Sequence, residues 1–496
     1  MKLSNEQSEI IKASQQFREG EILKIDACAG SGKTSTLVEI VKANPRKEFL
    51  YLAFNRSIAD KAGSIFPSNC VAMTIHSLAF RHLFHRQKPF LGNIKVSDLR
   101  EHFSLLNNYK LYELLMQYKA FLNSDEDVIP TRGIQRIFNL VSEGKLPCMH
   151  DHYLKIFEML PPEEQGLSEQ FDCILIDESQ DANPVMLNIL RKASCSKIFV
   201  GDSHQSIYGF RGAINALASQ EASVVKHLSI SFRSTQEVLD KANRYVSFFN
   251  NEVYDGQVPY IQMKCHSQAV ELRNEQHAII TRTNSKLVDV IAEYIDTPDE
   301  VLLLKRPEDV FKMPIAVYEF IHKRRRNFFG DLAFLNDFKN KNELEDYAEE
   351  TGDNEINVAI RIADKYKKML YVMKNKAAMM NSPKAPVVLT NAHTSKGLEW
   401  KSVQIEDDFP DLGDVYARCY LAPVEDTNLM ESLPLVERRS MVFYDFLQEL
   451  NLYYVAITRA QMEVTDLSVN GKYDTEEELS KHRDTCMAKY IKIMRA

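Results

Sequence analysis

The chain has 496 residues, and at roughly 150 residues per domain this length suggests about three compact units, which excludes a single small binding module. Hydrophobic residues make up 45% of the chain and charged residues 26%, a composition that excludes wholesale disorder. Acidic residues outnumber basic residues by 69 to 61, so the net charge is −8. A polyanionic partner would therefore have to be held by a local basic track and not by net charge.

The eight cysteines are scattered, with no Cys-x-x-Cys pair among them. This pattern is typical of reduced thiols in an intracellular protein. The N-terminal residues lack the apolar stretch of a signal peptide, and no run approaches the roughly 18 apolar residues that span a bilayer. We therefore expect a cytoplasmic protein with no membrane partner.

Short apolar runs recur along the chain, each followed by turn residues and then by a helical pattern. They occupy residues 22–26, 49–53, 173–177 and 197–201, and the same kind of run returns at 385–390 and 402–406. This alternation predicts an α/β protein with two lobes, each built on a parallel sheet. The segments at about 86–150 and about 300–384 are rich in Leu, Lys, Glu and Asn and are predicted to be mainly helical insertions.

A phosphate-binding loop is predicted at residues 27–34, Ala-Cys-Ala-Gly-Ser-Gly-Lys-Thr, between the first predicted strand and a helical pattern at 35–41. The glycines let backbone N–H groups turn toward phosphate oxygens, and the helix N-terminus adds its dipole. Lys33 is expected to reach the β- and γ-phosphates, and Thr34 to offer its hydroxyl to Mg²⁺. Ala27 stands where the general motif has its first glycine.

A pair of carboxylates, Asp177 and Glu178, follows the apolar run at 173–177 and supplies the second half of such a site. Asp177 is expected to hold Mg²⁺ through water, and Glu178 to accept a proton from the attacking water. An Asp-Glu pair after a strand is common by itself. Together with the phosphate-binding loop, it indicates nucleoside triphosphate hydrolysis.

Further motifs follow in a fixed order along the chain. They are Asp-Glu-Ser-Gln-Asp at 177–181, Gly-Asp-Ser-His-Gln-Ser-Ile-Tyr-Gly-Phe-Arg-Gly at 201–212, Ser-Phe-Arg-Ser at 231–234, Thr-Arg-Thr-Asn at 281–284, His-Thr-Ser-Lys-Gly-Leu-Glu-Trp at 393–400 and Tyr-Val-Ala-Ile-Thr-Arg-Ala at 454–460. From about Leu3 to Ala460 the chain thereby resembles superfamily 1 DNA helicases of the UvrD/Rep type. The sequence at residues 53–56 and 210–212 resembles the F-box DNA helicase branch more than UvrD itself.

The resemblance implies two RecA-like P-loop NTPase lobes, whose parallel sheets are flanked by helices, and two small, mainly helical insertion domains. The expected boundaries are 1–85 and 151–235 for lobe 1A with the ATP site, 86–150 for insertion 1B, 236–300 and 385–496 for lobe 2A, and 301–384 for a reduced insertion 2B. Full enzymes of the family are longer, so ATP-driven translocation is expected more firmly than duplex unwinding.

The resemblance also implies the site residues for ATP and Mg²⁺. Gln7 is expected to hydrogen bond with adenine and Glu399 to bind the ribose, while Phe232 lies beside the base or packs in the core. Gln205 is expected to sense the γ-phosphate, which arginines from the second side approach as the cleft closes. The implied catalytic residues are Lys33, Asp177, Glu178, Gln205, Arg233 and Arg459; the nucleotide-binding residues are Gln7, Ala29, Gly30, Ser31, Gly32, Lys33, Thr34, Ser35, Phe232, Arg233, Gly397, Glu399 and Arg459; the metal ligands are Thr34 and Asp177.

A track for single-stranded DNA is implied by residues that match family positions lining the channel. They are Phe54, Asn55, Thr74, His76, Tyr208, Phe210, Asn391 and His393. Aromatic side chains can stack on any base, which gives a grip that tolerates any sequence. Phe210 stands where the family commonly has Trp, Asn391 replaces Thr and Arg56 replaces Lys; His76 could instead be a core histidine.

We therefore expect an ATP-dependent translocase or helicase on single-stranded or tailed DNA, moving 3′ to 5′ by family resemblance, with a possible nuclease, repair or defence subunit as its partner. A rival is a nucleotide-gated DNA-binding regulatory subunit with weak activity alone, as in a phage-defence system; an RNA track is a third hypothesis. Two segments stay open: the basic cluster at 322–326, a solvated helix face or a nucleic-acid contact, and residues 407–448, a contact surface or a flexible loop. The run from Cys148 to His152 contains metal-capable side chains but lacks the second ligand pair of a structural zinc site.

Overall fold

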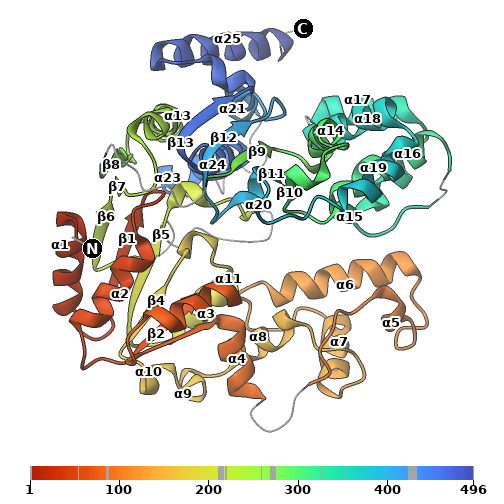
Figure 1. Ribbon diagram of the computed structural model, residues 1–496. Helices are drawn as coiled ribbons and strands as arrows, with labels where there is room; N and C mark the ends of the chain where they lie inside the picture. The colour runs from red at the N-terminus through yellow and green to blue at the C-terminus, as the bar shows by residue number, and fades with distance from the viewer. Residues whose placement is uncertain are drawn as a thin grey trace. The chain divides into compact units, whose positions relative to one another are not determined.

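The computed structural model describes residues 3–53, 55–84, 89–209, 217, 221–258, 260–267, 275–324, 327–351, 353–422 and 433–494. The chain divides into two compact units, Met1–Ile230 and Ser231–Ala496. Each unit is built on its own sheet, with helices on the faces of that sheet (Figure 1).

The first unit alternates strands and helices. Its described strands are β1 (Ile22–Ala27), β2 (Phe49–Ala53), β3 (Cys70–Thr74), β4 (Cys173–Ile176), β5 (Ser196–Gly201) and β6 (Val224–Leu228). Its described helices are α1 (Asn5–Gln15), α2 (Lys33–Ala43), α3 (Arg56–Ile65), α4 (Ile75–Leu83), α5 (Val96–Arg100), α6 (Asn108–Leu122), α7 (Arg132–Ser142), α8 (His150–Met159), α9 (Pro162–Gln165), α10 (Leu167–Gln170) and α11 (Pro184–Lys192), with 3-10 turns η1 (Ser179–Asp181) and η2 (Ser203–Gln205).

The six strands of this unit form one sheet in the order β3-β2-β4-β5-β1-β6, and every pairing is parallel. Side chains alternate between the two faces along each strand. Leu23 and Tyr51 pack on the face covered by α1, α2 and α3, while Leu50 and Ile174 pack on the opposite face with α4, α8 and α11. The order of strands brings β1, β4 and β5 together in the middle, so the loops after these strands meet at one edge of the sheet.

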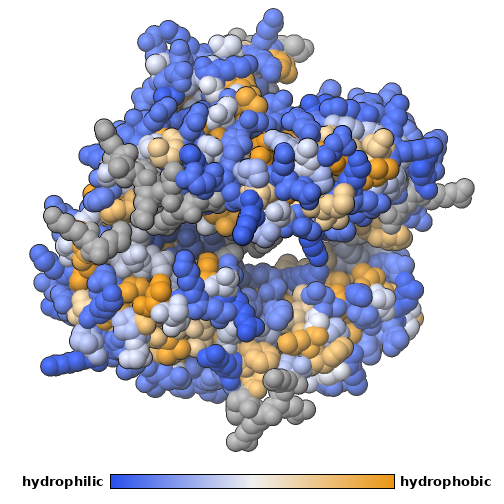
Figure 2. Space-filling model, viewed as in Figure 1, coloured by the Kyte–Doolittle hydropathy of each residue, from blue (hydrophilic) through white to orange (hydrophobic). Residues whose placement is uncertain are grey.

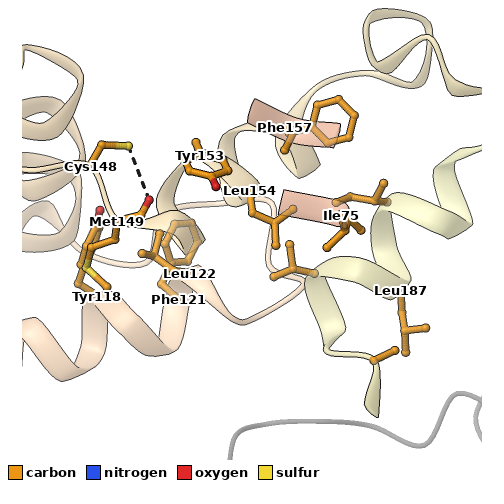
Figure 3. Packing of buried hydrophobic residues seen from close by; sticks show 14 of the residues in the cluster. Ile75, Tyr118, Phe121, Leu122, Cys148, Met149, Tyr153, Leu154, Phe157 and Leu187 are labelled. Carbon is orange, nitrogen blue, oxygen red and sulfur yellow. Dashed lines mark hydrogen bonds between the residues drawn. The ribbon is translucent and has the colours of Figure 1, made fainter. Parts of the chain in front are cut away.

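The helices of the segment 86–150 share a hydrophobic core with one face of this sheet. Tyr118 and Phe121 of α6 belong to the same buried cluster as Ile75 of α4, Phe157 of α8 and Leu187 of α11 (Figure 3). All five side chains are less than 9% exposed. The segment is mainly helical, as the sequence predicts, and in packing it is continuous with the lobe.

The second unit repeats the same plan. Its described strands are β8 (Lys264–Cys265), β9 (His277–Thr281), β10 (Val301–Leu303), β11 (Val387–Asn391), β12 (Trp400–Ile405) and β13 (Ala460–Asp466), and the short strand β7 (Ile230–Ser231) lies at the division between the units. Its described helices are α13 (Gln236–Tyr254), α14 (Asn284–Glu293), α15 (Pro307–Val310), α16 (Lys312–Ile321), α17 (Lys341–Thr351), α18 (Asn354–Tyr366), α19 (Met369–Ala377), α20 (Ala392–Ser395), α21 (Leu412–Leu421), α23 (Leu435–Val442), α24 (Tyr444–Ile457) and α25 (Glu476–Met494), with 3-10 turns η4 (Pro298–Glu300), η5 (Gly330–Asp337) and η6 (Val469–Lys472).

Five of these strands form a parallel sheet in the order β10-β11-β9-β12-β13. The predicted α/β class with parallel sheets flanked by helices is therefore confirmed. The segment that begins at 301 opens with β10, a strand of this sheet, and continues through α15 to α19. These helices share one buried cluster with Leu303 of β10, Ile279 of β9 and Leu389 of β11.

The described parts of the segment 407–448 contain helices, which pack on their neighbours. Helix α21 contacts α24 and, most extensively, the long helix α25 near the C-terminus. Asp411 caps the N-terminus of α21 by accepting hydrogen bonds from the N–H groups of Gly413 and Asp414. The same carboxylate binds Nε2 of His482 on α25 at 2.7 Å, which fastens α25 to α21.

The surface seen in Figure 2 is mostly hydrophilic, and its hydrophobic residues stand in small groups. None of the helices described here is long and apolar enough to cross a bilayer.

Candidate functional site: a phosphate-binding loop and its carboxylates

The loop between β1 and α2 has the backbone geometry of a phosphate cradle. Gly30 and Gly32 have φ values of +74° and +79°, in the left-handed region that glycine adopts at little cost. Helix α2 begins at Lys33, and its N-cap, Gly32, has no side chain to bond the first N–H groups. The N-terminus of this eleven-residue helix therefore presents backbone N–H donors and a positive dipole end to an anion.

The hydroxyls of Thr34 and Ser31 lie where the predicted Mg²⁺ and phosphate groups would need them. Thr34 donates a hydrogen bond from Oγ1 to Oδ2 of Asp177 at 3.0 Å. A hydroxyl and a carboxylate oxygen at this separation are the hard donors that Mg²⁺ prefers, so the residues present fit the predicted metal. The Ser31 hydroxyl is buried and has no hydrogen-bond partner among the described residues, as fits a group that awaits a phosphate oxygen.

The carboxylates Asp177 and Glu178 follow β4, at the edge of the sheet where the loop after β1 also lies. Glu178 has φ = +50°, and its N–H donates to Oδ1 of Asp177 at 2.9 Å. Burial, and then the neighbouring charge of Glu178, raise the pKa of the Asp177 carboxyl. A divalent cation would offset this cost, because it favours the ionised form of its ligand.

The Glu178 carboxylate lies between two donors. Its Oε1 is 3.6 Å from Nζ of Lys33, and its Oε2 accepts a hydrogen bond of 2.6 Å from Nε2 of Gln180. The structure thus brings together the predicted lysine, metal ligand and base within the first unit. Gln180 was not singled out from the sequence, although its place two residues after Glu178 in the 177–181 motif was a usable signal.

Tyr51 is a second residue that the sequence did not reveal as part of the site. Its hydroxyl donates to Oδ2 of Asp177 at 2.7 Å, and its ring is fully buried against Phe66. Burial, and then the charge of Asp177, raise the pKa of the Tyr51 hydroxyl, so it keeps its proton and acts as a donor. The sequence signal for this contact was weak: Tyr51 carries a hydroxyl within an otherwise apolar strand, and a buried hydroxyl requires a hydrogen-bond partner.

Gln205 lies in the 3-10 turn that follows β5, whose neighbour in the sheet is β1. Its Nε2 donates to Oδ2 of Asp202 at 2.7 Å, and the N–H of Asp202 donates to Oε1 of Gln180 at 3.1 Å. Asp26, at the end of β1, accepts a hydrogen bond from the N–H of Ser203. Burial, and then the charge of Asp202, raise the pKa of Asp26. A polar network therefore links the predicted γ-phosphate sensor to Glu178 through Gln180.

Gln7, the predicted adenine reader, is buried at the start of α1. Its Oε1 accepts from the N–H of Ser4, its own N–H donates to the Ser4 hydroxyl, and its Nε2 donates to Oγ1 of Thr36 in α2. This capping box fixes the orientation of the amide. Its anchoring to α2 holds the predicted base-binding segment against the phosphate-binding helix.

Two residues predicted to contact different parts of ATP bind each other in the second unit. Arg233 donates from Nε to Oε2 of Glu399 at 2.7 Å, and its Nη1 donates to the carbonyl of Thr458. Gly397, two residues before Glu399, has φ = +84° in the turn before β12. The ring of Phe232 packs on His266, with ring centres 4.5 Å apart. Packing of Phe232 is thus real, and its contact with a base stays a prediction.

Arg459, the other predicted arginine of the second unit, is fully buried. Its Nε donates to the carbonyl of Val455 at 2.9 Å, Nη1 to the carbonyl of Leu398 at 3.2 Å and Nη2 to Oγ1 of Thr458 at 3.1 Å. These bonds tie the end of α24 to the turn that carries Glu399. The motif at 454–460 gives no sign of this structural use of the side chain.

Three of the predicted DNA residues of the first unit, Asn55, Thr74 and His76, lie just after the strands β2 and β3. Asn55 caps α3 and Thr74 caps α4, each through its side-chain oxygen. His76 lies 3.3 Å from Asp151 and is 37% exposed, and its hydrogen bond lowers the pKa of that carboxyl. His76 is therefore not a buried core histidine. Tyr208 is half-buried, while Phe54 and Phe210 lie outside the described residues.

The predicted DNA residues of the second unit follow β11. Asn391 is buried, its Nδ2 donates to Oδ1 of Asn284 at 2.8 Å, and its Oδ1 accepts from the N–H of Thr394. Oδ1 of Asn284 also accepts from Nζ of Lys305 at 2.8 Å. His393 is half-buried in the first turn of α20. Asn391 thus orders the turn that carries His393.

The metal-capable side chains at 148–152 have separate partners. Nδ1 of His150 bonds the Tyr153 hydroxyl at 2.8 Å, and Nδ1 of His152 bonds the Tyr118 hydroxyl at 2.6 Å. Cys148 lies in the shared core of the first unit. These contacts supply no support for a metal at this place.

Comparison with known proteins gives several matches. Residues 149–224, which include Asp177, Glu178 and Gln205, match the family described as UvrD/REP helicase N-terminal domain. Over 93% of its length the chain is 27% identical to F-box DNA helicase 1 of Gallus gallus, and over 92% it is 27% identical to F-box DNA helicase protein 1 of Schizosaccharomyces pombe. The chain is also 24% identical to the ATP-dependent DNA helicase srs2 of S. pombe. This match covers 57% of the chain and 40% of the relative.

The chain matches only part of the length of these relatives. The matches span 48% of the chicken protein and 56% of the first fission yeast protein, so the chain spans about half the length of the curated relatives it matches.

Proposed function

We propose that the chain is an ATP-dependent DNA helicase or translocase of the UvrD-like type, because residues 149–224 match the UvrD/REP helicase N-terminal domain and two F-box DNA helicases are similar to it over most of its length. ATP is the proposed fuel and single-stranded or tailed DNA the proposed track. The relatives that support this proposal are all DNA helicases.

One observation carries the proposal: a glycine-rich loop, a helix N-terminus, a lysine and two acidic residues converge within a single unit. The links are the contact of Thr34 with Asp177 at 3.0 Å and that of Lys33 with Glu178 at 3.6 Å. They join residues 143 and 145 positions apart in the sequence, so the fold and not the local sequence creates the site. Such an arrangement suits the transfer of a phosphoryl group to water.

Each side chain has a proposed task in hydrolysis. Lys33 and the N–H groups at the start of α2 bind the phosphates, and Glu178 accepts a proton from the attacking water. Mg²⁺, when held by Thr34 and Asp177, would neutralise charge on the β- and γ-phosphates. Gln205 reports on the γ-phosphate through its link to Asp202, Gln180 and Glu178.

Movement along DNA is proposed to follow from relative motion of the two lobes during ATP hydrolysis, as family resemblance implies. Arg233 and Arg459 would then stabilise negative charge on the departing phosphoryl group, so hydrolysis is tied to lobe movement. Asn55, Thr74, His76 and Tyr208 in one lobe, and Asn391 and His393 in the other, would hold the strand. We propose movement from 3′ to 5′, as family resemblance implies.

Steady-state ATP hydrolysis with and without single-stranded DNA tests this function, with Lys33→Ala as the blank. Strong stimulation by DNA that disappears in Lys33→Ala is the expected result. Duplexes with a 3′ tail or a 5′ tail then test polarity, and a single-stranded RNA of the same sequence tests the track. Equal hydrolysis by the wild-type protein and Lys33→Ala would contradict the assignment of the site.

A second candidate is a partner-dependent subunit of a repair or defence complex, whose DNA binding is gated by nucleotide. The observation that favours it is the paired state of the catalytic charges: Glu178 is engaged by Lys33 and Gln180, and Arg233 by Glu399. A site closed in this way suits an enzyme that is activated by a partner. Little hydrolysis in the presence of DNA, together with measurable ATP and DNA binding, would favour this candidate.

A further inference from the structure

The metal-side carboxylate of the proposed ATP site is held by three donors. Oδ1 of Asp177 accepts from the N–H of Glu178 at 2.9 Å, and Oδ2 accepts both from the hydroxyl of Thr34 at 3.0 Å and from that of Tyr51 at 2.7 Å. The Tyr51 bond is the shortest of the three. Thr34 is itself a proposed metal ligand, so Tyr51 is the side-chain donor that would stay on Asp177, beside the N–H of Glu178, when Thr34 binds the cation.

The register of the sheet explains why this tyrosine reaches that carboxylate. Tyr51 of β2 is paired with Leu175 of β4, and Asp177 lies two residues after Leu175. Side chains two residues apart share a face, so Tyr51, Leu175 and Asp177 are directed to the same side of the sheet. This register accounts for the hydrogen bond from the Tyr51 hydroxyl to Asp177, which lies directly after the end of β4.

Packing by itself does not account for the hydroxyl. All five residues of β2 are buried, and Tyr51 is the one among them with a polar side chain. The ring packs against Phe66 in the cluster formed with α2 and α3, and a phenylalanine would fill the same space. Burying a hydroxyl is costly unless it is bonded, and this hydroxyl bonds a group of the active site.

We propose that Tyr51 is a positioning residue that fixes the orientation of Asp177 for Mg²⁺ in the ATP site. This inference rests on the proposed function of that site. Groups that orient a metal-binding carboxylate commonly change metal affinity when removed, although they never touch the metal. Tyr51 acts through Asp177 in this sense and is not itself a ligand.

The test replaces Tyr51 by phenylalanine, which keeps the ring and removes only the hydroxyl. The matched control is Tyr453→Phe in the second unit, because Tyr453 is also fully buried and donates to Asp466 at 2.6 Å. Both variants lose one buried Tyr–Asp hydrogen bond, so a general loss of stability affects both. Thermal unfolding monitored by circular dichroism establishes that each variant is folded.

The decisive measurement is the affinity for Mn²⁺ in the presence of a non-hydrolysable ATP analogue. Electron paramagnetic resonance detects the bound Mn²⁺. We expect Tyr51→Phe to weaken Mn²⁺ binding about ten-fold and to raise the Mg²⁺ concentration needed for half-maximal hydrolysis, with analogue binding in the absence of metal unchanged. Tyr453→Phe should keep wild-type Mn²⁺ affinity.

The outcomes separate this inference from the function on which it rests. Wild-type Mn²⁺ affinity in Tyr51→Phe, or an equal loss in both variants, overturns the role of Tyr51 and leaves the ATP site standing. A wild-type protein that binds neither the analogue nor Mn²⁺ with it overturns both.

Discussion

Arg233 and Glu399 form a hydrogen-bonded ion pair, with Nε of the arginine 2.7 Å from Oε2 of the glutamate. The two residues are 166 positions apart, and both side chains are about one-sixth exposed. Family resemblance gives Arg233 to the γ-phosphate and Glu399 to the ribose, which are opposite ends of ATP. If both predicted roles hold, this ion pair must open before the two residues bind the nucleotide.

Removal of Arg233 should affect catalysis more than stability. We expect Arg233→Ala to lower the rate of ATP turnover at least about 100-fold, because an arginine that stabilises the transferred phosphoryl group contributes this much or more. Loss of a partly exposed ion pair should change the unfolding free energy by only about 1 kcal/mol. ATP turnover and thermal unfolding, measured on the same preparation, check the catalytic effect and the stability effect. Normal turnover in Arg233→Ala would show that Arg233 has no role in hydrolysis.

Arg459→Ala should differ from Arg233→Ala by a large loss of stability. The Arg459 guanidinium is fully buried and donates to two backbone carbonyls, those of Val455 and Leu398. Alanine would leave these carbonyls without their charged donor, at a cost of about 3 kcal/mol. Fluorescence of Trp400, the only tryptophan, reports on the second unit during urea unfolding. An unfolding midpoint equal to that of Arg233→Ala would contradict the structural role.

Substitution of the proposed base should separate binding from hydrolysis. Glu178→Gln keeps the size of the side chain and removes the charge that helps to raise the pKa of Asp177. We expect undiminished binding of Mg²⁺–ATP and almost no turnover. Equilibrium binding of a fluorescent ATP analogue, beside steady-state hydrolysis, checks this. Wild-type turnover in Glu178→Gln would refute the assignment of the base.

His152 should make the first unit less stable in acid. Its side chain is 1% exposed, and burial lowers its pKa from 6.5 to about 4. The folded state then binds fewer protons than the unfolded state between these values. The unfolding free energy should therefore fall by up to about 3 kcal/mol as the pH decreases from 6.5 to 4.

Circular dichroism during urea unfolding at several pH values checks this prediction, since Trp400 does not report on the first unit. His152→Leu should reduce the loss in this pH range. Tyr118→Phe removes the partner of His152 but keeps the titrating group, so it serves as the control. An identical pH profile in the wild-type protein and His152→Leu would show that other groups dominate.

The strands and the phosphate-binding loop were predictable because their signals are local. Four or five consecutive apolar residues, as in β4 and β2, predict a buried strand, and glycines before Lys33 predict the turn that the φ values of Gly30 and Gly32 require. The predicted strand at 173–177 is one residue too long, because β4 ends at Ile176 and Asp177 lies in the turn that follows.

The contacts that arrange the site were not predictable in the same way. Tyr51 reaches Asp177 only because β2 and β4 pair in one particular register, and nothing within β2 shows that register. The burial of Arg459 depends in the same way on the turn at Leu398, 61 residues earlier. A motif gives the type of side chain at a position, whereas its partners are set by tertiary structure.

The shared core of α6, α8 and the first sheet has a consequence for dissecting the protein. Tyr118, Phe121 and Phe157 are at most 3% exposed, and they belong to one buried cluster that includes residues of the sheet such as Leu50 and Ile174. A shortened chain without residues 86–150 would leave much of this apolar face open to water and prone to association. A minimal motor would require a redesigned surface on α4, α8 and α11, and exchange of this segment between relatives would require their matching core residues as well.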